Sequence, residues 1–168
     1  QFVIDVVASV RGKVGRADLP YYLIGHSAGG QFLNRLAAFL PGEAVRIVST
    51  NPGTLIFPDR SVPFQFGFGG LPDRWSDDAW IKKYLAAPLT LYLGTADTES
   101  ANLDMTPEAM RQGSTRIERG RACFQRAEAL ARERGWPFGW TLVEAEGIGH
   151  SSAQMFAHPK AEEAIFGR

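Results

Sequence analysis

The stretch Tyr21-Tyr22-Leu23-Ile24-Gly25-His26-Ser27-Ala28-Gly29 decides the fold class of this chain. Its first four residues are apolar or aromatic and have the length of a buried parallel strand. The Gly-x-Ser-x-Gly pattern behind them is typical of a sharp strand-to-helix turn with the serine exposed at its apex, and small residues two positions on each side leave room for the bend. The following helix would point its first N–H groups at whatever Ser27 attacks. The stretch therefore predicts a nucleophilic serine, in a serine hydrolase or the remnant of one.

The residues behind the motif support a helix. Apolar side chains between Gln31 and Leu40 recur near helical spacing, and Pro41-Gly42 ends the pattern. The alternative is a glycine-rich helix start with an idle serine, because 18 glycines among 168 residues favour chance matches to the motif. Candidate partners of Ser27 elsewhere in the chain decide between the two.

Two such partners follow predicted strands. The apolar run at residues 89–94 is followed by Asp97, and the run at 140–145 is followed by His150. Because the carboxyl ends of parallel strands meet at one edge of a sheet, Ser27, Asp97 and His150 are expected to lie together, in a chain order known for such triads. Taken singly, Asp97 could be a helix cap or turn residue and His150 a loop residue.

At these positions the chain resembles the α/β-hydrolase superfamily. The resemblance is carried by residues 25–30 (GHSAGG), 93–98 (LGTADT) and 147–151 (GIGHS). Within the superfamily the chain is most similar to bacterial esterase-type members, the group around polyhydroxybutyrate depolymerase-like and feruloyl-esterase-like proteins. The resemblance implies Ser27 as nucleophile, Asp97 as the orienting acid and His150 as base, with the Ala28 backbone N–H as one oxyanion donor. Asp104 and Glu99 are the alternative acids, since both follow the same strand.

The predicted fold class is α/β. We expect a parallel sheet of about four strands near residues 21–25, 45–50, 89–94 and 140–145, adjacent in that order, with helices on both faces. An amphipathic helix is expected before the first strand. The family has four strands ahead of its nucleophile strand, so the resemblance implies a single, N-terminally truncated domain over residues 1–168 that holds the C-terminal portion of the fold. The expected consequences are a missing second oxyanion donor and an apolar strand edge, at residues 21–25, that could support self-association.

The connection at about residues 51–87 is too long for a simple loop, and the resemblance to the α/β-hydrolases implies that it forms a short lid over the active site. Phe64, Phe66 and Phe68 alternate along it, so an extended stretch would present all three to one side as an apolar wall for substrate. Alternatively they pack the lid onto the sheet. His26 is expected to pack or hydrogen-bond beside the substrate site. Ser76-Asp77-Asp78 predicts a helix start.

Composition argues against several classes of function. The formal net charge is zero, which gives no electrostatic case for nucleic acid or an anionic membrane. No apolar run is long enough to span a bilayer, and the three histidines lack metal-ligand spacing, so neither a metal nor another cofactor is predicted. The arginine-rich stretch near residues 111–134 predicts a surface helix with a solvated face, and the single Cys123 within it a packed thiol.

The expected reaction is hydrolysis of a small-molecule carboxylic ester through an acyl-enzyme. An amidase, a thioesterase or a lipase on the same triad remains open. A catalytically incomplete fragment, with the triad present but unable to turn over, is the alternative from a different class.

Overall fold

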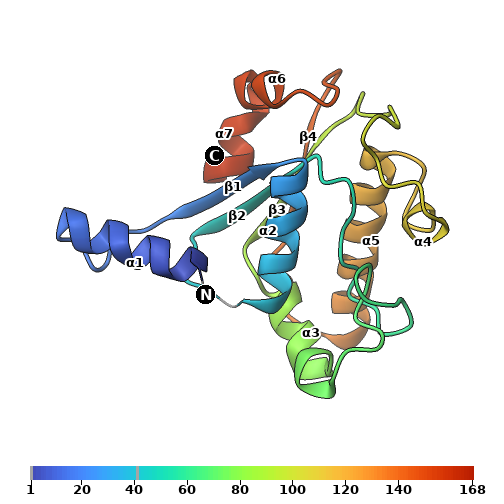
Figure 1. Ribbon diagram of the computed structural model, residues 1–168, viewed down its shortest axis with the longest axis horizontal. Coiled ribbons are helices and arrows are strands. Elements are labelled where there is room, and N and C mark those ends of the chain that lie inside the picture. Colours follow the sequence, from blue (N-terminus) through green and yellow to red (C-terminus); the bar gives the residue numbers. More distant parts are fainter. Residues whose placement is uncertain (1, 41) are drawn as a thin grey trace.

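The computed structural model describes residues 2–40 and 42–168 and contains a four-stranded parallel sheet (Figure 1). The strands are hydrogen-bonded in the order β1-β2-β3-β4, and every neighbouring pair is parallel. Their bounds are Tyr22–His26, Arg46–Thr50, Leu89–Gly94 and Thr141–Ala145. The predicted strand positions, order and direction are therefore confirmed.

Helices cover both faces of this sheet (Figure 1). On one face lie α2 (Ala28–Phe39), α3 (Asp78–Leu85) and α5 (Arg116–Arg134), and on the other lie α6 (Ser152–Ala157) and α7 (Lys160–Phe166). Two short helices, η1 (Asp73–Trp75) and α4 (Pro107–Met110), lie in the connections. Across the described parts of the chain, no helix combines the length and the apolar character needed to cross a bilayer.

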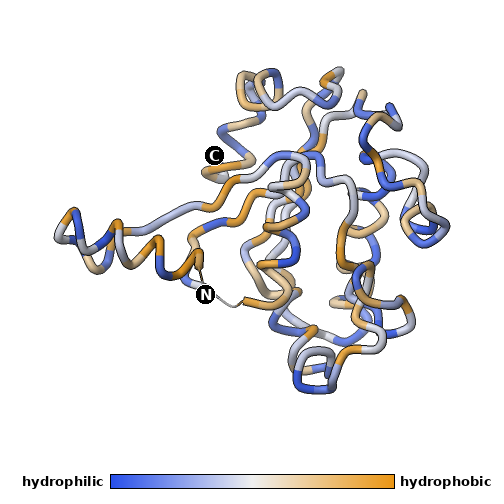
Figure 2. The backbone as a smooth tube through the Cα atoms, viewed as in Figure 1, coloured by the Kyte–Doolittle hydropathy of each residue, from blue (hydrophilic) through white to orange (hydrophobic). Residues whose placement is uncertain are grey.

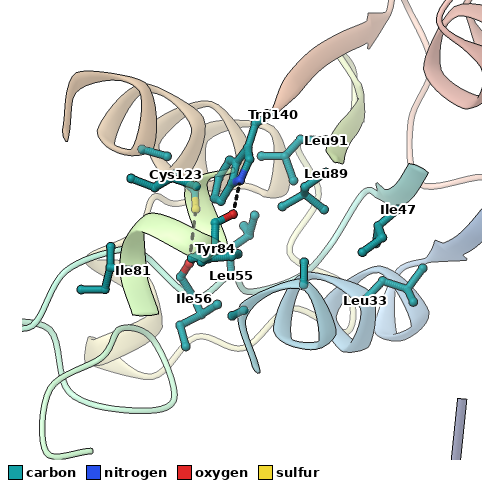
Figure 3. Packing of buried hydrophobic residues seen from close by; sticks show 14 of the residues in the cluster. Leu33, Ile47, Leu55, Ile56, Ile81, Tyr84, Leu89, Leu91, Cys123 and Trp140 are labelled. Atoms are coloured by element: carbon teal, nitrogen blue, oxygen red, sulfur yellow. Dashed lines mark hydrogen bonds between the residues drawn. The ribbon is translucent and has the colours of Figure 1, made fainter. Parts of the chain in front are cut away.

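The larger core fills the space between the sheet and α2, α3 and α5 (Figure 3). Tyr84 lies near its centre, where its hydroxyl accepts from Asn34 Nδ2 at 2.9 Å and donates to the Ile56 carbonyl at 3.0 Å. Trp140 Nε1 donates to the Tyr84 carbonyl at 2.9 Å. These bonds satisfy polar groups whose burial would otherwise be unfavourable. Cys123 is fully buried against Ile56, which confirms the predicted packed thiol.

The second core lies under α6 and α7. Tyr92 extends into it from β3, and its hydroxyl donates to the Met155 carbonyl at 2.7 Å. The other members are small or aliphatic residues of the strands and helices: Val48, Val143, Ala145, Met155, Ala161 and Ala164. The sheet therefore contributes buried side chains to both faces, as expected of parallel strands.

The helix predicted ahead of β1 forms α1 (Phe2–Val14), which extends to one side of the molecule (Figure 1). No side chain of α1 is buried, and hydrophobic residues line α1 and the edge strand β1 (Figure 2). The exposed apolar side chains there are Phe2, Ile4, Val6, Val10, Val14, Tyr22 and Ile24. β1 is the edge strand of the sheet, as predicted, while self-association through it stays a prediction.

The arginine-rich stretch differs from the prediction. α5 begins only at Arg116, where the Thr115 side chain accepts from the Glu118 N–H and caps the helix. Arg116 and Arg119 are 1% and 0% exposed, so the predicted solvated arginine face is wrong for these two residues. Their guanidinium groups are buried because backbone carbonyls of the surrounding loops accept their hydrogen bonds.

Candidate active site

Ser27 occupies the tight turn between β1 and α2. Its backbone has φ 55° and ψ −116°, outside the regions that non-glycine residues usually occupy. Its N–H donates to the Thr50 carbonyl at 2.9 Å, and its carbonyl accepts from the Gln31 N–H at 2.9 Å. The turn is therefore held by the neighbouring strand β2 on one side and by α2 on the other.

Two glycines beside Ser27 allow β1, α2 and β2 to approach closely. A Cβ atom on Gly25 would lie 2.6 Å from the backbone C and O atoms of Gly29, and one on Gly30 would lie 2.8 Å from the Thr50 carbonyl oxygen. A Cβ atom on Gly29 would meet no heavy atom within 4 Å. The sequence-based explanation, which required small residues two positions on each side of the serine, is thus correct for Gly25 and wrong for Gly29. The close approach on the helix side involves Gly30.

His150 joins Ser27 to Asp97. Its Nε2 atom lies 2.9 Å from Ser27 Oγ, and its Nδ1 atom lies 2.7 Å from Asp97 Oδ2. The Asp97 side chain is 1% exposed, whereas the His150 side chain is 28% exposed. Asp97 as an acceptor at Nδ1 favours the tautomer with Nδ1 protonated, which leaves Nε2 free to accept from the serine hydroxyl.

Hydrogen bonds between loops bring Asp97 and His150 together. The Ala96 N–H donates to the Ile148 carbonyl at 3.0 Å, and the Gly147 N–H donates to Thr95 Oγ1 at 2.8 Å. The loops after β3 and β4 are thereby linked directly beyond the strand ends. The carboxyl ends of parallel strands are expected to bring Asp97 and His150 close together, and these two hydrogen bonds hold them there.

His26 lies beside His150, with ring centroids 4.8 Å apart and an interplanar angle of 36°. Burial, followed by the nearby His150, lowers the pKa of His26. His26 is consequently neutral at pH 7 and adds no positive charge next to the His150 ring. This contact agrees with the expectation that His26 packs beside the site, and substrate binding by His26 stays a prediction.

Ala28, the candidate oxyanion donor, is the first residue of α2. N–H groups in the first turn of a helix have no partner within that helix and carry the positive end of its dipole. The Ala28 N–H is thus suitably located to donate to an oxyanion that forms at a carbonyl attacked by Ser27.

The His150 ring nitrogens face Asp97 and Ser27, and neither alternative acid is hydrogen-bonded to them. The Asp104 carboxylate accepts from the Thr106 N–H at 2.9 Å and from its hydroxyl at 2.8 Å, and these two bonds lower the pKa of Asp104. Glu99 is exposed. Within the described residues, no group of three or more His, Cys, Asp or Glu side chains is placed to hold a metal ion.

The structure contradicts the predicted wall of three phenylalanines at Ser27. Residues 61–70 form turns rather than an extended stretch. Phe64 and Phe68 both pack on Phe39 at the far end of α2, roughly 16 Å from its first residue by the rise of the helix. Phe68 belongs to the main core, and Phe66 lies in a separate pocket with Phe57 and Gln112.

Asn51 is a residue of the site that the sequence analysis missed. It directly follows β2, where its Oδ1 atom accepts from the Gly94 N–H at 2.7 Å and its Nδ2 atom donates to the Gly149 carbonyl at 3.2 Å. It also has a positive φ of 44°. Its position at a strand's carboxyl end is the signal that selected Asp97 and His150, so the same rule could have identified it.

Arg116 is the second residue missed. Its Nη1 atom lies 3.3 Å from Asp97 Oδ1, deep inside the protein. The sequence offers no local signal for this contact, because Arg116 stands among several arginines that are exposed. The contact depends on how the start of α5 packs against the loop after β3.

No protein-family model matches the chain, and no curated protein matches it. The chain does match solved structures, two of which are hydrolases by name. Poly(aspartic acid) hydrolase-1 from Sphingomonas sp. KT-1 is 36% identical, with a TM-score of 0.83 over 90% of this chain and 58% of that chain. LpqC, a poly(3-hydroxybutyrate) depolymerase from Bordetella parapertussis, is 34% identical, with a TM-score of 0.85 over 99% of this chain and 56% of that chain.

This chain has an esterase-type α/β-hydrolase-like fold. The resemblance found in the sequence is thereby confirmed, including the similarity to polyhydroxybutyrate depolymerase-like proteins. The chain spans somewhat more than half the length of each neighbour. Both neighbours are hydrolases by name, which supports a hydrolytic function in general.

Proposed function

We propose that this α/β-hydrolase-like chain is a serine hydrolase that cleaves carboxylic esters through an acyl-enzyme on Ser27. The observation that carries the proposal is the continuous path of hydrogen bonds from the Ser27 hydroxyl through the His150 ring to the Asp97 carboxylate. A serine hydroxyl is a weak nucleophile until a neighbouring base accepts its proton, and this path provides that base and orients it.

In the first half-reaction, Ser27 Oγ forms a bond to the carbonyl carbon of the ester while its proton passes to His150 Nε2. The carbonyl oxygen becomes an oxyanion, to which the Ala28 N–H donates. Asp97 stabilises the imidazolium through Nδ1. When the tetrahedral intermediate collapses, the bond to the alcohol oxygen breaks, and His150 returns the proton to the leaving alkoxide.

In the second half-reaction, His150 accepts a proton from a water molecule that attacks the acyl carbon. The bond between that carbon and Ser27 Oγ breaks, and the proton passes back to the serine oxygen. The products are the carboxylic acid and a restored enzyme. The partial exposure of His150 supports this step, because water and substrate can reach Nε2.

Amide hydrolysis on the same residues is the second candidate. Poly(3-hydroxybutyrate) is a polyester and poly(aspartic acid) is a polyamide, so the two neighbours' names point to two linkages. We also propose that residues 1–168 act as one domain and that the segment 51–87 borders the substrate site. Asn51, at the start of that segment, supports this arrangement through its bonds to Gly94 and Gly149.

The test is covalent labelling by a fluorophosphonate. Ser27 Oγ would form the bond to phosphorus, fluoride would leave, and the serine proton would pass to His150. Labelling is expected for the wild-type chain and for Ser152→Ala, a control that removes an exposed serine at the start of α6. It should be lost in Ser27→Ala and in His150→Ala. Equal labelling of Ser27→Ala and the wild type would remove Ser27 as the nucleophile.

A further inference from the structure

Arg116 is a buried charged residue that the mechanism above does not use. Its side chain and that of Asp97 are each 1% exposed, and they form an ion pair with a distance of 3.3 Å between Nη1 and Oδ1. Transferring a guanidinium and a carboxylate out of water is costly unless each has a partner. The position of Arg116 at the first residue of α5 therefore depends on Asp97, a residue of the proposed active site.

The two oxygens of the Asp97 carboxylate have different partners. Oδ1 faces the Arg116 guanidinium, while Oδ2 accepts from His150 Nδ1. Partners on both oxygens fix the plane of the carboxylate, and with it the direction in which Oδ2 faces the imidazole. The guanidinium beside Oδ1 also offsets part of the cost of burying the carboxylate charge.

Arg116 further holds the loop that follows Asp97. Its Nη1 atom donates to the Glu99 carbonyl at 3.0 Å, and its Nη2 atom donates to the Ala101 carbonyl at 2.6 Å. One planar guanidinium thus binds a side chain and two backbone carbonyls of a single loop. A lysine ammonium has no such fork of donors and could not keep all three contacts.

We propose that Arg116 is a positioning residue of this site. It orients Asp97, and its positive charge sets the pH below which the reaction of Ser27 with His150 as base slows. The proposal rests on the function proposed above for Ser27 and His150. Arg116 contacts neither substrate nor reacting atoms in this scheme, so it acts only through Asp97.

The expected pH effect follows from the charges around His150. The groups packed around its ring are His26 from β1, Ser27 at the start of α2, Asp97 after β3 and, behind Asp97, Arg116 from α5. Burial lowers the pKa of His26 and so disfavours a charge on it, and at pH 7 Asp97 and Arg116 are the buried charges of this group. The exposed carboxylates of the adjoining loops, Glu99 and Glu146, are screened by solvent. Arg116 therefore opposes protonation of His150, which would place a second positive charge beside Asp97.

The test measures the rate of fluorophosphonate labelling of the 168-residue chain as a function of pH. In Arg116→Met the midpoint of the acidic limb of the pH–rate profile should move upward by about one pH unit. The reason is the loss of a unit positive charge that is separated from the His150 ring only by the Asp97 carboxylate. In Arg116→Lys the limb should stay in place while the rate falls by roughly tenfold, because the charge remains but the fork of donors does not. A purely structural role predicts no such difference between the two variants.

Arg119→Met is the matched control. Arg119 is buried in the next turn of α5, but its Nη atoms donate to the Gly53 carbonyl at 2.7 Å and the Asp104 carbonyl at 2.8 Å. Its loss should lower the thermal midpoint yet move the acidic limb much less than Arg116→Met does. Should Arg116→Met fail to fold by circular dichroism, Arg116→Gln carries the same test, since it keeps hydrogen-bond donors without the charge.

A second readout does not depend on catalysis. The chain has only three histidines, so the ring signals of His150 can be followed by NMR during a pH titration. Protonation of that ring at higher pH in Arg116→Met than in the wild type supports the inference, even if no chain is labelled and the proposed function fails. An unchanged acidic limb and an unchanged ring titration in a folded, labelled Arg116→Met overturn the inference and leave the proposed function intact.

Discussion

Replacing Gly25 by alanine should destabilise the chain by about 2 kcal/mol. The added Cβ would lie 2.6 Å from the Gly29 carbonyl carbon and oxygen and 3.0 Å from Leu33 Cδ1. Unstrained carbon contacts are about 3.5–4.0 Å, so the first turn of α2 must move away from β1 by about 1 Å. The Gly29 atoms belong to the backbone, which has no rotamer change available to relieve the contact. In a domain of this size, 2 kcal/mol corresponds to a fall in Tm of about 4–8 °C.

The same displacement should reduce the reaction of Ser27. Ser27 stands between Gly25 and the first residue of α2, and its Oγ lies 2.9 Å from His150 Nε2. A misplacement of about 1 Å can lower a rate by about a hundredfold. Thermal unfolding followed by circular dichroism and the rate of fluorophosphonate labelling measure the two effects on one preparation.

Gly29→Ala is the control for Gly25→Ala. A Cβ at Gly29 meets no heavy atom within 4 Å, and Gly29 lies inside α2, where alanine is favoured over glycine by up to about 1 kcal/mol. Its Tm should equal or exceed that of the wild type. A Gly25→Ala chain as stable and as quickly labelled as Gly29→Ala would refute the idea that close approach of β1 and α2 positions Ser27.

Three further outcomes are expected. Asn51→Ala should lower stability by about 1–3 kcal/mol and slow labelling of Ser27, because it removes the bonds to Gly94 and Gly149; unchanged unfolding and labelling would contradict this. Burial raises the pKa of the Cys123 thiol, so a thiol reagent at pH 8 should modify Cys123 only after the chain is unfolded in denaturant, and rapid modification of the folded chain would argue against its burial. Folding lowers the pKa of His26 from 6.5, so the unfolded chain binds a proton more readily than the folded chain does. The stability of the wild type should therefore fall as the pH drops below about 6.5. Between pH 7 and pH 5, the thermal midpoint of His26→Gln should fall less than that of the wild type, and an equal fall in both would contradict this.

The four strands could be predicted from the sequence because each contains consecutive apolar residues and is followed by a polar residue. The strand order could be predicted because consecutive parallel strands are usually neighbours joined by short, right-handed crossover connections. The location of Asp97 and His150 followed from one further rule, that the carboxyl ends of parallel strands share an edge. These inferences use only local patterns and a topology that few sheets violate.

The remainder required contacts between segments distant in the sequence. Phe64, Phe66 and Phe68 alternate as a strand would, but their segment folds as turns and packs on Phe39 and Tyr84 instead. Periodicity does not reveal which partner a side chain will meet. The burial of Arg116 could not be predicted for the same reason. Its hydrogen-bond acceptors are Asp97 and loop carbonyls, which no helical pattern identifies.

β2 leads to none of the three proposed catalytic side chains, yet the residues at its end hold the segments that carry them. β2 lies between the strand that leads to Ser27 and the strand that leads to Asp97. At its end, the Thr50 carbonyl accepts from the Ser27 N–H, and the next residue, Asn51, binds the loops of Asp97 and His150 at Gly94 and Gly149. The three segments that hold Ser27, Asp97 and His150 are thereby bonded to two consecutive residues, the last residue of β2 and the one after it. Because small displacements in such a site are costly, substitutions at Asn51 should impair the proposed reaction of Ser27 although Asn51 contacts none of the three side chains proposed to perform it.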